Sequence, residues 1–106
     1  MGFQVESHGG TAHIEGEMTI YSAAALHAQA MTAVNRARKK AAFDLSQVTE
    51  FDTAGLQIIL SARKHAAARG CSFGIVAASP VVRDALALCG LQGLCSDGKR
   101  KGAGRG

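Results

Sequence analysis

Apolar and polar residues alternate with the period of β-strands in the first part of the chain. The segments FQVES (residues 3–7) and TAHIEGE (residues 11–17) carry this alternation, which directs successive side chains to opposite faces of a strand. Between them lies HGG (residues 8–10), whose glycines are typical of a tight turn. The sequence therefore predicts two short strands joined by a turn.

The pattern changes to the period of a helix after Ser22, whose side chain can cap a helix. The segment AAALHAQAMTAVNRARKK (residues 23–40) is a strong helix former. Its basic end, RARKK, is expected to close the helix, because cations complement the helix dipole and the last carbonyls. Four apolar residues fall on roughly one face: Leu26, Ala30, Val34 and Ala37.

A short strand and a second helix follow. AAFDLS (residues 41–46) predicts a strand that runs into a turn. The next segment, TAGLQIILSARKHAAARG (residues 53–70), predicts a helix that begins at Asp52 or Thr53 and stops at Gly70. One side of this helix carries the apolar residues Leu56, Ile59, Leu60 and Ala67.

A last strand and a last helix complete the pattern. CSFGIVA (residues 71–77) predicts an apolar strand, and the helix after it has Ser79 at the N-cap, Pro80 at its first position and Gly90 just past its end. The resulting order, β-β-α-β-α-β-α, predicts a single α/β domain in which helices pack against a small mixed β-sheet. The apolar residues of the last helix share one face: Val82, Ala85, Leu86 and Cys89.

Positive charge is concentrated at the C-terminal end of the 106-residue chain. The formal net charge is +4, and DGKRKGAGRG (residues 97–106) contributes +3 of it. We interpret residues 1–96 as the domain and residues 97–106 as a basic, Gly-rich, disordered tail. A nearly neutral domain with 5% aromatic residues argues against nucleic-acid binding. RGCSFGIV starts like the RNP1 segment of RNA-binding domains, but only Phe73 supplies an aromatic ring where that motif needs one.

The cysteines and the apolar runs indicate the compartment. No CxxC pair occurs and no signal peptide is evident, so we expect reduced thiols in a cytoplasm and neither a metal site nor a cofactor. No apolar run reaches the ~20 residues that span a bilayer, and stable membrane insertion is not expected. The cysteines are Cys71, Cys89 and Cys95.

Residues for catalysis do not gather by spacing. The four histidines lie on different predicted elements, and no Ser/His/Asp or Cys/His arrangement is evident, so an enzyme is not expected. Asp44 and Asp52 can approach one another across the loop before the second helix, and paired carboxylates can perform acid–base chemistry or hold magnesium. We favour a simpler interpretation, in which Asp44 ties down the loop and Asp52 caps or orients the helix.

The stretch DTAGL (residues 52–56) carries the candidate site. Asp52 and Thr53 are both good N-caps, whereas Gly55 costs a helix about 1 kcal/mol relative to alanine. Its presence predicts that a neighbouring strand or another protein approaches the backbone closely. A hydroxyl on Thr53 lies where the free amides of a helix N-terminus favour anions, so a phosphate there is expected to change the docking surface without melting the helix.

This stretch and the residues around it resemble STAS domains, the sulfate-transporter and anti-sigma-factor-antagonist family. AAFDLSQVTEFDTAGLQIILSARKHAAARG is similar to the central segment of that family, in which a strand ending in Asp-Leu-Ser leads through a loop with an apolar residue, here Val48, to a helix opened by Asp, a hydroxyl residue and Gly-Leu. CSFGIVAASPVVRDALALCGL and TAHIEGEMTIYSAAAL extend the likeness, which covers residues 3–94.

The resemblance implies a non-catalytic, phosphorylation-gated protein-interaction switch. In anti-sigma factor antagonists the hydroxyl residue is phosphorylated by a cognate GHKL-type serine/threonine kinase that is also the anti-sigma factor, the unphosphorylated domain binds that kinase, and a phosphatase resets the switch. By position the phospho-acceptor is Thr53, and the partner-binding residues are Asp44, Asp52, Gly55 and Leu56.

The identity of the acceptor residue leaves the pathway open. Many members of the sigma pathway carry serine where this chain has Thr53. Threonine also occurs at this position in STAS subunits of a bacterial lipid-transport ABC complex and in chemotaxis-type signalling proteins, which remain alternatives. Homodimerisation also remains open.

Overall fold

The computed structural model describes residues 2–95 and forms one four-stranded sheet with the order β1-β2-β3-β4. β1 (Phe3–His8) and β2 (Thr11–Met18) form an antiparallel hairpin, and β3 (Lys40–Phe51) and β4 (Ser72–Ala78) continue the sheet in parallel. The helices are α1 (Ala23–Asn35), α2 (Thr53–Ala68) and α3 (Pro80–Leu88), followed by the short 3₁₀ helix η1 (Gln92–Leu94). The predicted fold class and element order are confirmed. The predicted tail lies outside the described residues.

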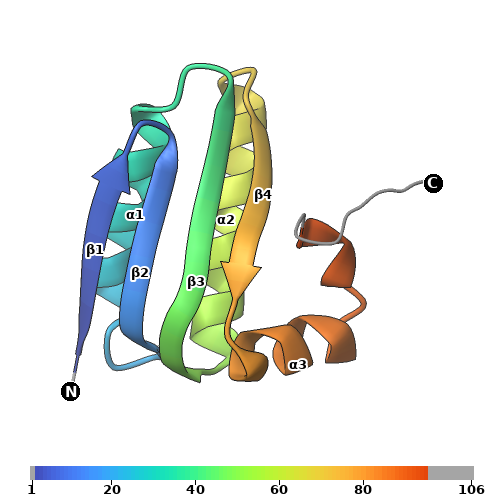
Figure 1. The fold of residues 1–106 in the computed structure, drawn as a ribbon. Helices are drawn as coiled ribbons and strands as arrows, with labels where there is room; N and C mark the ends of the chain where they lie inside the picture. Colours follow the sequence, from blue (N-terminus) through green and yellow to red (C-terminus); the bar gives the residue numbers. More distant parts are fainter. Residues whose placement is uncertain (1, 96–106) are drawn as a thin grey trace.

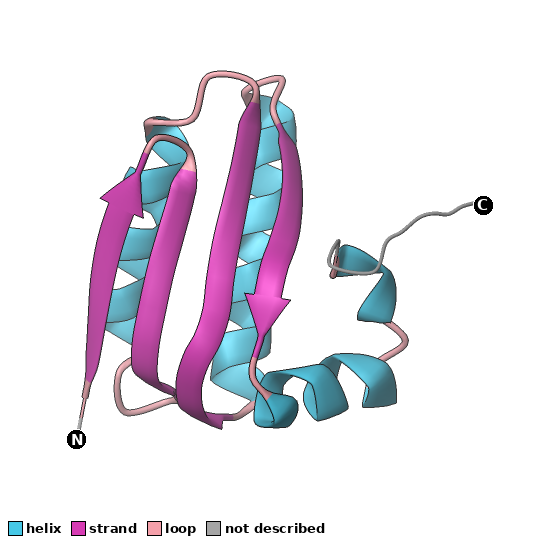
Figure 2. Ribbon diagram, in the orientation of Figure 1, coloured by secondary structure: helices cyan, strands magenta, loops and turns pink. Residues whose placement is uncertain are grey.

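Two helices cover one face of the sheet. Figures 1 and 2 show α1 behind β1 and β2 and α2 behind β3 and β4, with α3 beyond β4. The core between the sheet and these two helices is apolar because inward-facing residues alternate along each strand, as Ala41, Phe43 and Leu45 do on β3. The predicted face of α1 is confirmed for Leu26, Ala30 and Val34, which are buried; Ala37 is also buried but follows the end of the helix. The opposite face of the sheet carries polar side chains on β1 to β3, such as Gln4, Glu15 and Asp44.

β3 is twice as long as the sequence pattern indicates. The predicted strand covered residues 41–46 and ended in a turn, but β3 runs from Lys40 to Phe51. Its second half pairs with the end of β2, where Gly16 lies opposite Val48 and Met18 lies opposite Phe51. The polar residues between these pairs hide the strand in the sequence, and its second half is held by pairing with β2 and by the buried side chain of Val48.

α1 is shorter than predicted. It ends at Asn35, with Arg36 as its C-cap residue, so the basic run RARKK follows the helix and does not form its last turns. Residues 36–39 connect the helix to β3 and Lys40 is the first residue of that strand: Lys40 pairs with Ser72, and the Ser72 amide donates to the Lys39 carbonyl at 2.9 Å. Pairing across the sheet therefore overrides the strong local helix preference of this segment.

The apolar face of α2 also differs from the prediction. Ile59 is fully buried, but Ala67 is exposed, while Leu56 and Leu60 are only partly buried. The face that contacts the sheet and α1 lies about a quarter turn away and is formed by Gly55, Ile58, Ile59, Ala62 and Ala66. Small residues dominate this face, so the hydrophobicity of individual side chains was a poor guide to its position.

α3 has the predicted boundaries but not all of the predicted contacts. Pro80 is its first residue, and Gly90 follows its end with a φ of 71°. The Ser79 side chain makes no capping hydrogen bond; the Ser79 amide donates to the Leu45 carbonyl at 3.0 Å and ties the helix to β3. Cys89, predicted on the apolar face, is exposed, whereas Cys71 is buried.

Candidate interaction site at the start of α2

Asp52 is the N-cap residue of α2 and joins three elements. Its backbone is extended, and its Oδ1 accepts a hydrogen bond from the Ala54 amide at 2.8 Å. Its Oδ2 accepts from the Ile20 amide at 3.0 Å, and its own amide donates to the Met18 carbonyl at 3.2 Å. One carboxylate therefore holds the first turn of α2 against the segment between β2 and α1.

Thr53 is the first residue of α2 and is exposed. Since Asp52 supplies the cap, the sequence alternative in which Thr53 caps the helix is wrong. Within residues 2–95 the Thr53 hydroxyl has no hydrogen-bond partner. This hydroxyl is consequently available to another molecule at a helix N-terminus, where anions are favoured.

Gly55 is buried two residues further along α2, and its neighbours belong to the same chain. A Cβ at this position would lie 2.6 Å from the Met18 carbonyl oxygen and 2.8 Å from two carbons of the Phe51 ring. Of the two explanations that the sequence left open, the close approach of a neighbouring strand is therefore the one observed. Gly55 allows α2 to start directly against the ends of β2 and β3.

Exposed apolar side chains lie near Thr53. On one side lies a hollow of about 220 Å³, which we call the α2 groove; it is lined by Phe51, Asp52, Thr53 and Leu56 and, from α3, by Ala85, Leu88 and Cys89. Leu88 is 89% exposed beside this groove. Ile20 and Tyr21 are 69% and 93% exposed, and the Ile20 amide is bonded to Asp52, next to Thr53. Large apolar side chains this exposed are typical of interaction surfaces.

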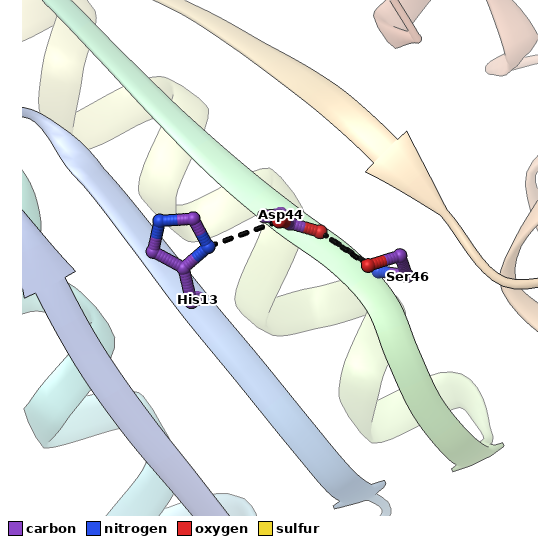
Figure 3. A network of polar contacts seen from close by, with 3 residues as sticks. All are labelled: His13, Asp44 and Ser46. Atoms are coloured by element: carbon purple, nitrogen blue, oxygen red, sulfur yellow. Dashed lines mark hydrogen bonds and ion pairs between the residues drawn. The ribbon is translucent and has the colours of Figure 1, made fainter.

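Asp44 lies elsewhere, on the open polar face of the sheet. Figure 3 shows its carboxylate between His13 of β2 and Ser46. Oδ2 lies 2.9 Å from His13 Nδ1, and Oδ1 accepts from the Ser46 amide at 3.0 Å and from its hydroxyl at 2.7 Å. Asp44 is thus in the middle of β3 and not at its end, and it links neighbouring positions of the sheet without tying down the loop before α2.

The predicted approach of Asp44 and Asp52 to one another does not occur. Both belong to one extended segment, and eight residues at 3.2–3.4 Å each separate them by roughly 25 Å. A shared acid–base or magnesium site between them is therefore excluded by the length of β3. Among residues 2–95 no group of three metal-ligating side chains gathers elsewhere.

The surroundings of Asp44 make its contribution to stability depend on pH. Burial alone would raise the pKa of Asp44, but hydrogen bonds from the Ser46 hydroxyl and amide and the contact with His13 outweigh it, so that the pKa lies below its ordinary value of 3.8. A lowered pKa means that the folded state binds this proton less tightly than the unfolded state. The stabilisation of the folded state by the Asp44 carboxylate is complete above pH 3.8. It is lost as the pH falls through the lower pKa that Asp44 has in the folded state.

We expect Asp44→Asn to be less stable than the wild type at neutral pH, and the difference to shrink below pH 3.8. Urea unfolding of both proteins from neutral pH down to about pH 3 measures this difference in the free energy of unfolding. A difference that stays constant, or that grows towards low pH, would contradict the assigned contacts of Asp44.

Comparisons with known proteins identify the family. The family model described as "Mlab, STAS domain" matches residues 1–96. The chain is a STAS domain. Its fold is similar to that of the anti-sigma factor antagonist SpoIIAA in its unphosphorylated form, with a TM-score of 0.71 and 22% identity over 92% of this chain and 88% of that chain.

Two further solved structures share the fold. An anti-sigma factor antagonist from Mycobacterium paratuberculosis has a TM-score of 0.70 and 27% identity over 88% of this chain and 80% of that one. The phosphorylated form of the Bacillus cell fate determinant SpoIIAA has a TM-score of 0.66 and 21% identity over 92% and 91%. No curated protein matches the chain significantly. In the part of this STAS domain that the structure describes, no helix is both long and apolar enough to cross a bilayer.

Sequence reasoning located the start of α2 but missed its surroundings. It singled out Asp52, Thr53, Gly55 and Leu56, which the structure brings together, and it also included Asp44, which lies apart. It missed Ile20, Tyr21 and Leu88. The sequence did carry a signal for Ile20 and Tyr21. They are two large apolar residues between a strand and a helix, and they continue the hydrophobic pattern of neither element.

Proposed function

We propose that this STAS domain is a non-catalytic protein-interaction switch that binds its partner when Thr53 is unphosphorylated. The observation that carries the proposal is the exposed hydroxyl of Thr53 on the first residue of α2, in the lining of the α2 groove and one residue from Asp52, which binds the Ile20 amide. A partner that docks in the α2 groove contacts Thr53, which is one of its lining residues. The Thr53 hydroxyl therefore lies within the proposed interface.

Phosphorylation acts on such an interface through charge and volume. A phosphate adds about −1.5 to −2 charges at neutral pH, directly beside the Asp52 carboxylate. Docking would then bury a dianion and a carboxylate against apolar side chains, and desolvation of unpaired charge is costly. The helix itself tolerates the phosphate, because its N-terminal amides favour anions and because Asp52, not Thr53, supplies the cap.

For the partner we favour a cognate GHKL-type serine/threonine kinase, reset by a phosphatase, in a bacterial cytoplasm. The support is similarity: two of the structural relatives are anti-sigma factor antagonists by name, and SpoIIAA has been solved in both unphosphorylated and phosphorylated forms. Asp52 and Leu56 are assigned direct partner contacts, whereas Gly55 acts by setting the position of α2. For Asp44, which lies apart from Thr53 on the open face of the sheet, we propose at most a contact at the margin of the partner interface.

A second candidate is a STAS subunit of a bacterial lipid-transport ABC complex. The observation that favours it is the description of the matching family model, which names Mlab and not an anti-sigma factor antagonist. The identity of adjacent reading frames separates the candidates, since a GHKL-type kinase gene selects the first and an ABC transporter gene selects the second. Both candidates use the same docking surface around Thr53.

Thr53→Glu tests the switch by adding a charge without a kinase. We expect it to unfold near the wild-type temperature but to bind the purified kinase or transporter subunit at least tenfold more weakly, a change of about 1.4 kcal/mol. Thr53→Ala is expected to bind like the wild type and to resist phosphorylation. Calorimetric unfolding and titration calorimetry on the same samples measure both quantities.

Ala67→Glu is the matched control, because it adds the same charge to an exposed position at the other end of α2. It is expected to leave the affinity for the partner unchanged. Equal affinities for Thr53→Glu, Thr53→Ala and the wild type would refute the switch and leave Thr53 as an ordinary surface residue.

A further inference from the structure

β1 forms an edge of the sheet whose outer side is unpaired within residues 2–95. The Glu17 amide donates to the Gly2 carbonyl at 2.8 Å, so Gly2 directs its carbonyl towards β2. The register between β1 and β2 is unbroken, from Phe3 opposite Gly16 to His8 opposite Thr11. Because antiparallel ladders alternate, the amides and carbonyls of Phe3, Val5 and Ser7 therefore point away from β2, towards the free edge.

Nothing in β1 protects this edge from another strand. Natural sheets protect exposed edges with proline, lysine, bulges or very short strands. β1 is six residues long, FQVESH, with neither proline nor lysine and with no bulge in its pairing. The opposite edge differs, since Cys95 forms an isolated bridge to Ile75 of β4 and α3 lies beyond β4 (Figure 1). β1 is therefore the edge at which the sheet can be extended.

The adjoining side of α1 is also uncovered and is built from small residues. A hollow of about 290 Å³ lies between Val5 and Ser7 of β1 and the residues Ala28, Gln29, Thr32 and Arg36. Towards the start of α1 this surface continues past Phe3 to Ala24 and Ala25. Three exposed alanines and a threonine along one side of a helix leave room for a second helix to pack closely.

We infer that a second copy of this chain pairs with β1 in antiparallel orientation, about a two-fold axis at Val5. In this register Val5 lies opposite the Val5 of the other copy, and Phe3 lies opposite Ser7. All of these residues have outward amides and carbonyls, so each pair exchanges two hydrogen bonds. The two sheets join into one continuous sheet with both copies of α1 on the same face.

Charge and hydrogen bonding select this register over its neighbours. With the axis at Val5, Gln4 lies opposite Glu6 on the open face, and these non-hydrogen-bonded positions bring side chains closest. An axis at Glu6 would place Glu6 opposite its own copy, and like charges directly opposite are destabilising. An axis at Gln4 would lose one of the hydrogen-bonded pairs, because Ser7 would extend past the end of the opposing β1.

The same axis aligns the two copies of α1. Phe3 lies level with Ala25, and Val5 and Ser7 lie level with Ala28 and Thr32, because they line the same hollows. A two-fold axis at Val5 therefore sets the Ala25 end of one α1 against the Thr32 end of the other. The hollow beside β1 is filled by the small side chains of the second helix. Strand pairing and helix packing are satisfied by one arrangement.

This interface lies away from the α2 groove, although its Phe3 end shares a hollow with Ile20 and Tyr21. Figure 1 shows α3, which forms one wall of the α2 groove, at the edge of the sheet opposite β1. Each copy in the dimer thus keeps its own α2 groove and Thr53, and the assembly presents two partner sites. The inference does not rest on the proposed function, and failure of either leaves the other standing.

Sedimentation equilibrium on the wild type and on Ala28→Glu tests the dimer. We expect the wild-type mass to rise from monomer to dimer with concentration up to about 1 mM. Ala28→Glu places like charges near the axis on an exposed helix surface, so it should remain folded and monomeric. Ala67→Glu, the same change on exposed α2, should dimerise like the wild type. A wild type that stays monomeric throughout overturns the inference and leaves the edge for a strand of another protein.

A pair of substitutions at Gln4 tests the register. Gln4→Lys places a lysine opposite Glu6 at both ends of the seam, whereas Gln4→Glu places a glutamate there. We expect about a tenfold difference in the dimer dissociation constant, with Gln4→Lys the tighter, and we expect high salt to remove it. Equal dissociation constants at low salt would rule out this register.

Amide hydrogen exchange distinguishes the edge from other surfaces. Protection of the Phe3, Val5 and Ser7 amides should increase with protein concentration, while the Gln4 and Glu6 amides, which already face β2, should change little. Dimerisation without protection of these three amides would place the interface elsewhere and contradict pairing through β1.

Discussion

Replacing Gly55 with alanine is expected to lower the free energy of unfolding by about 2 kcal/mol. The new Cβ would lie 2.6 Å from the Met18 carbonyl oxygen, a backbone atom that moves only if the end of β2 moves. Helix propensity alone favours alanine by about 1 kcal/mol, so the two arguments predict opposite signs. Urea unfolding monitored by circular dichroism gives the free energy and decides between them.

Gly93→Ala provides the control for this substitution. Gly93 lies in η1, has no atom within 4 Å of an added Cβ and has no positive φ. Its replacement is expected to change the free energy of unfolding by less than about 0.5 kcal/mol. If Gly55→Ala were as stable as the wild type, the contact between α2 and the end of β2 would be looser than the structure has it.

Replacing Asp52 with alanine is expected to cost about 2 kcal/mol of stability. The substitution removes the N-cap hydrogen bond to the Ala54 amide, for which about 1 kcal/mol is typical. It also removes the acceptor of the Ile20 amide, a charge-assisted hydrogen bond between two parts of the chain. Thermal and urea unfolding measure the loss, and proteolysis at Ile20 and Tyr21 should become faster because this segment is no longer held.

Thr53→Ala is the matched control, one residue away at the same helix end. Thr53 is exposed and does not cap α2, so its replacement should cost less than about 0.5 kcal/mol. The reverse order of stabilities, with Thr53→Ala the less stable variant, would assign the cap to Thr53. The difference between the variants therefore separates the residue that stabilises the site from the residue that is proposed to carry the phosphate.

The amino-acid sequence by itself determined the elements whose signals are local. The boundaries of α3 follow from Pro80 and Gly90, which act through their own backbone preferences, and the β1–β2 turn follows from Gly9, which has a positive φ, in the same way. The buried face of α1 follows from the helical repeat of its apolar residues, which recur every three or four positions. The position of the site followed from the DTAGL stretch, because capping and glycine geometry are properties of one helix end.

Tertiary structure decided everything that depends on pairing between distant segments. The second half of β3 pairs with the end of β2, and α1 stops at Asn35, five residues before Lys40 begins β3. The extension of β3 separates Asp44 from Asp52, and the register with β2 sets Asp44 beside His13. The α2 groove needs Leu88, more than thirty positions after Thr53. Local propensity acts over a few residues and can be read from them. Strand pairing and packing join segments that are far apart along the chain, and neither segment's own residue pattern shows which partner it will meet.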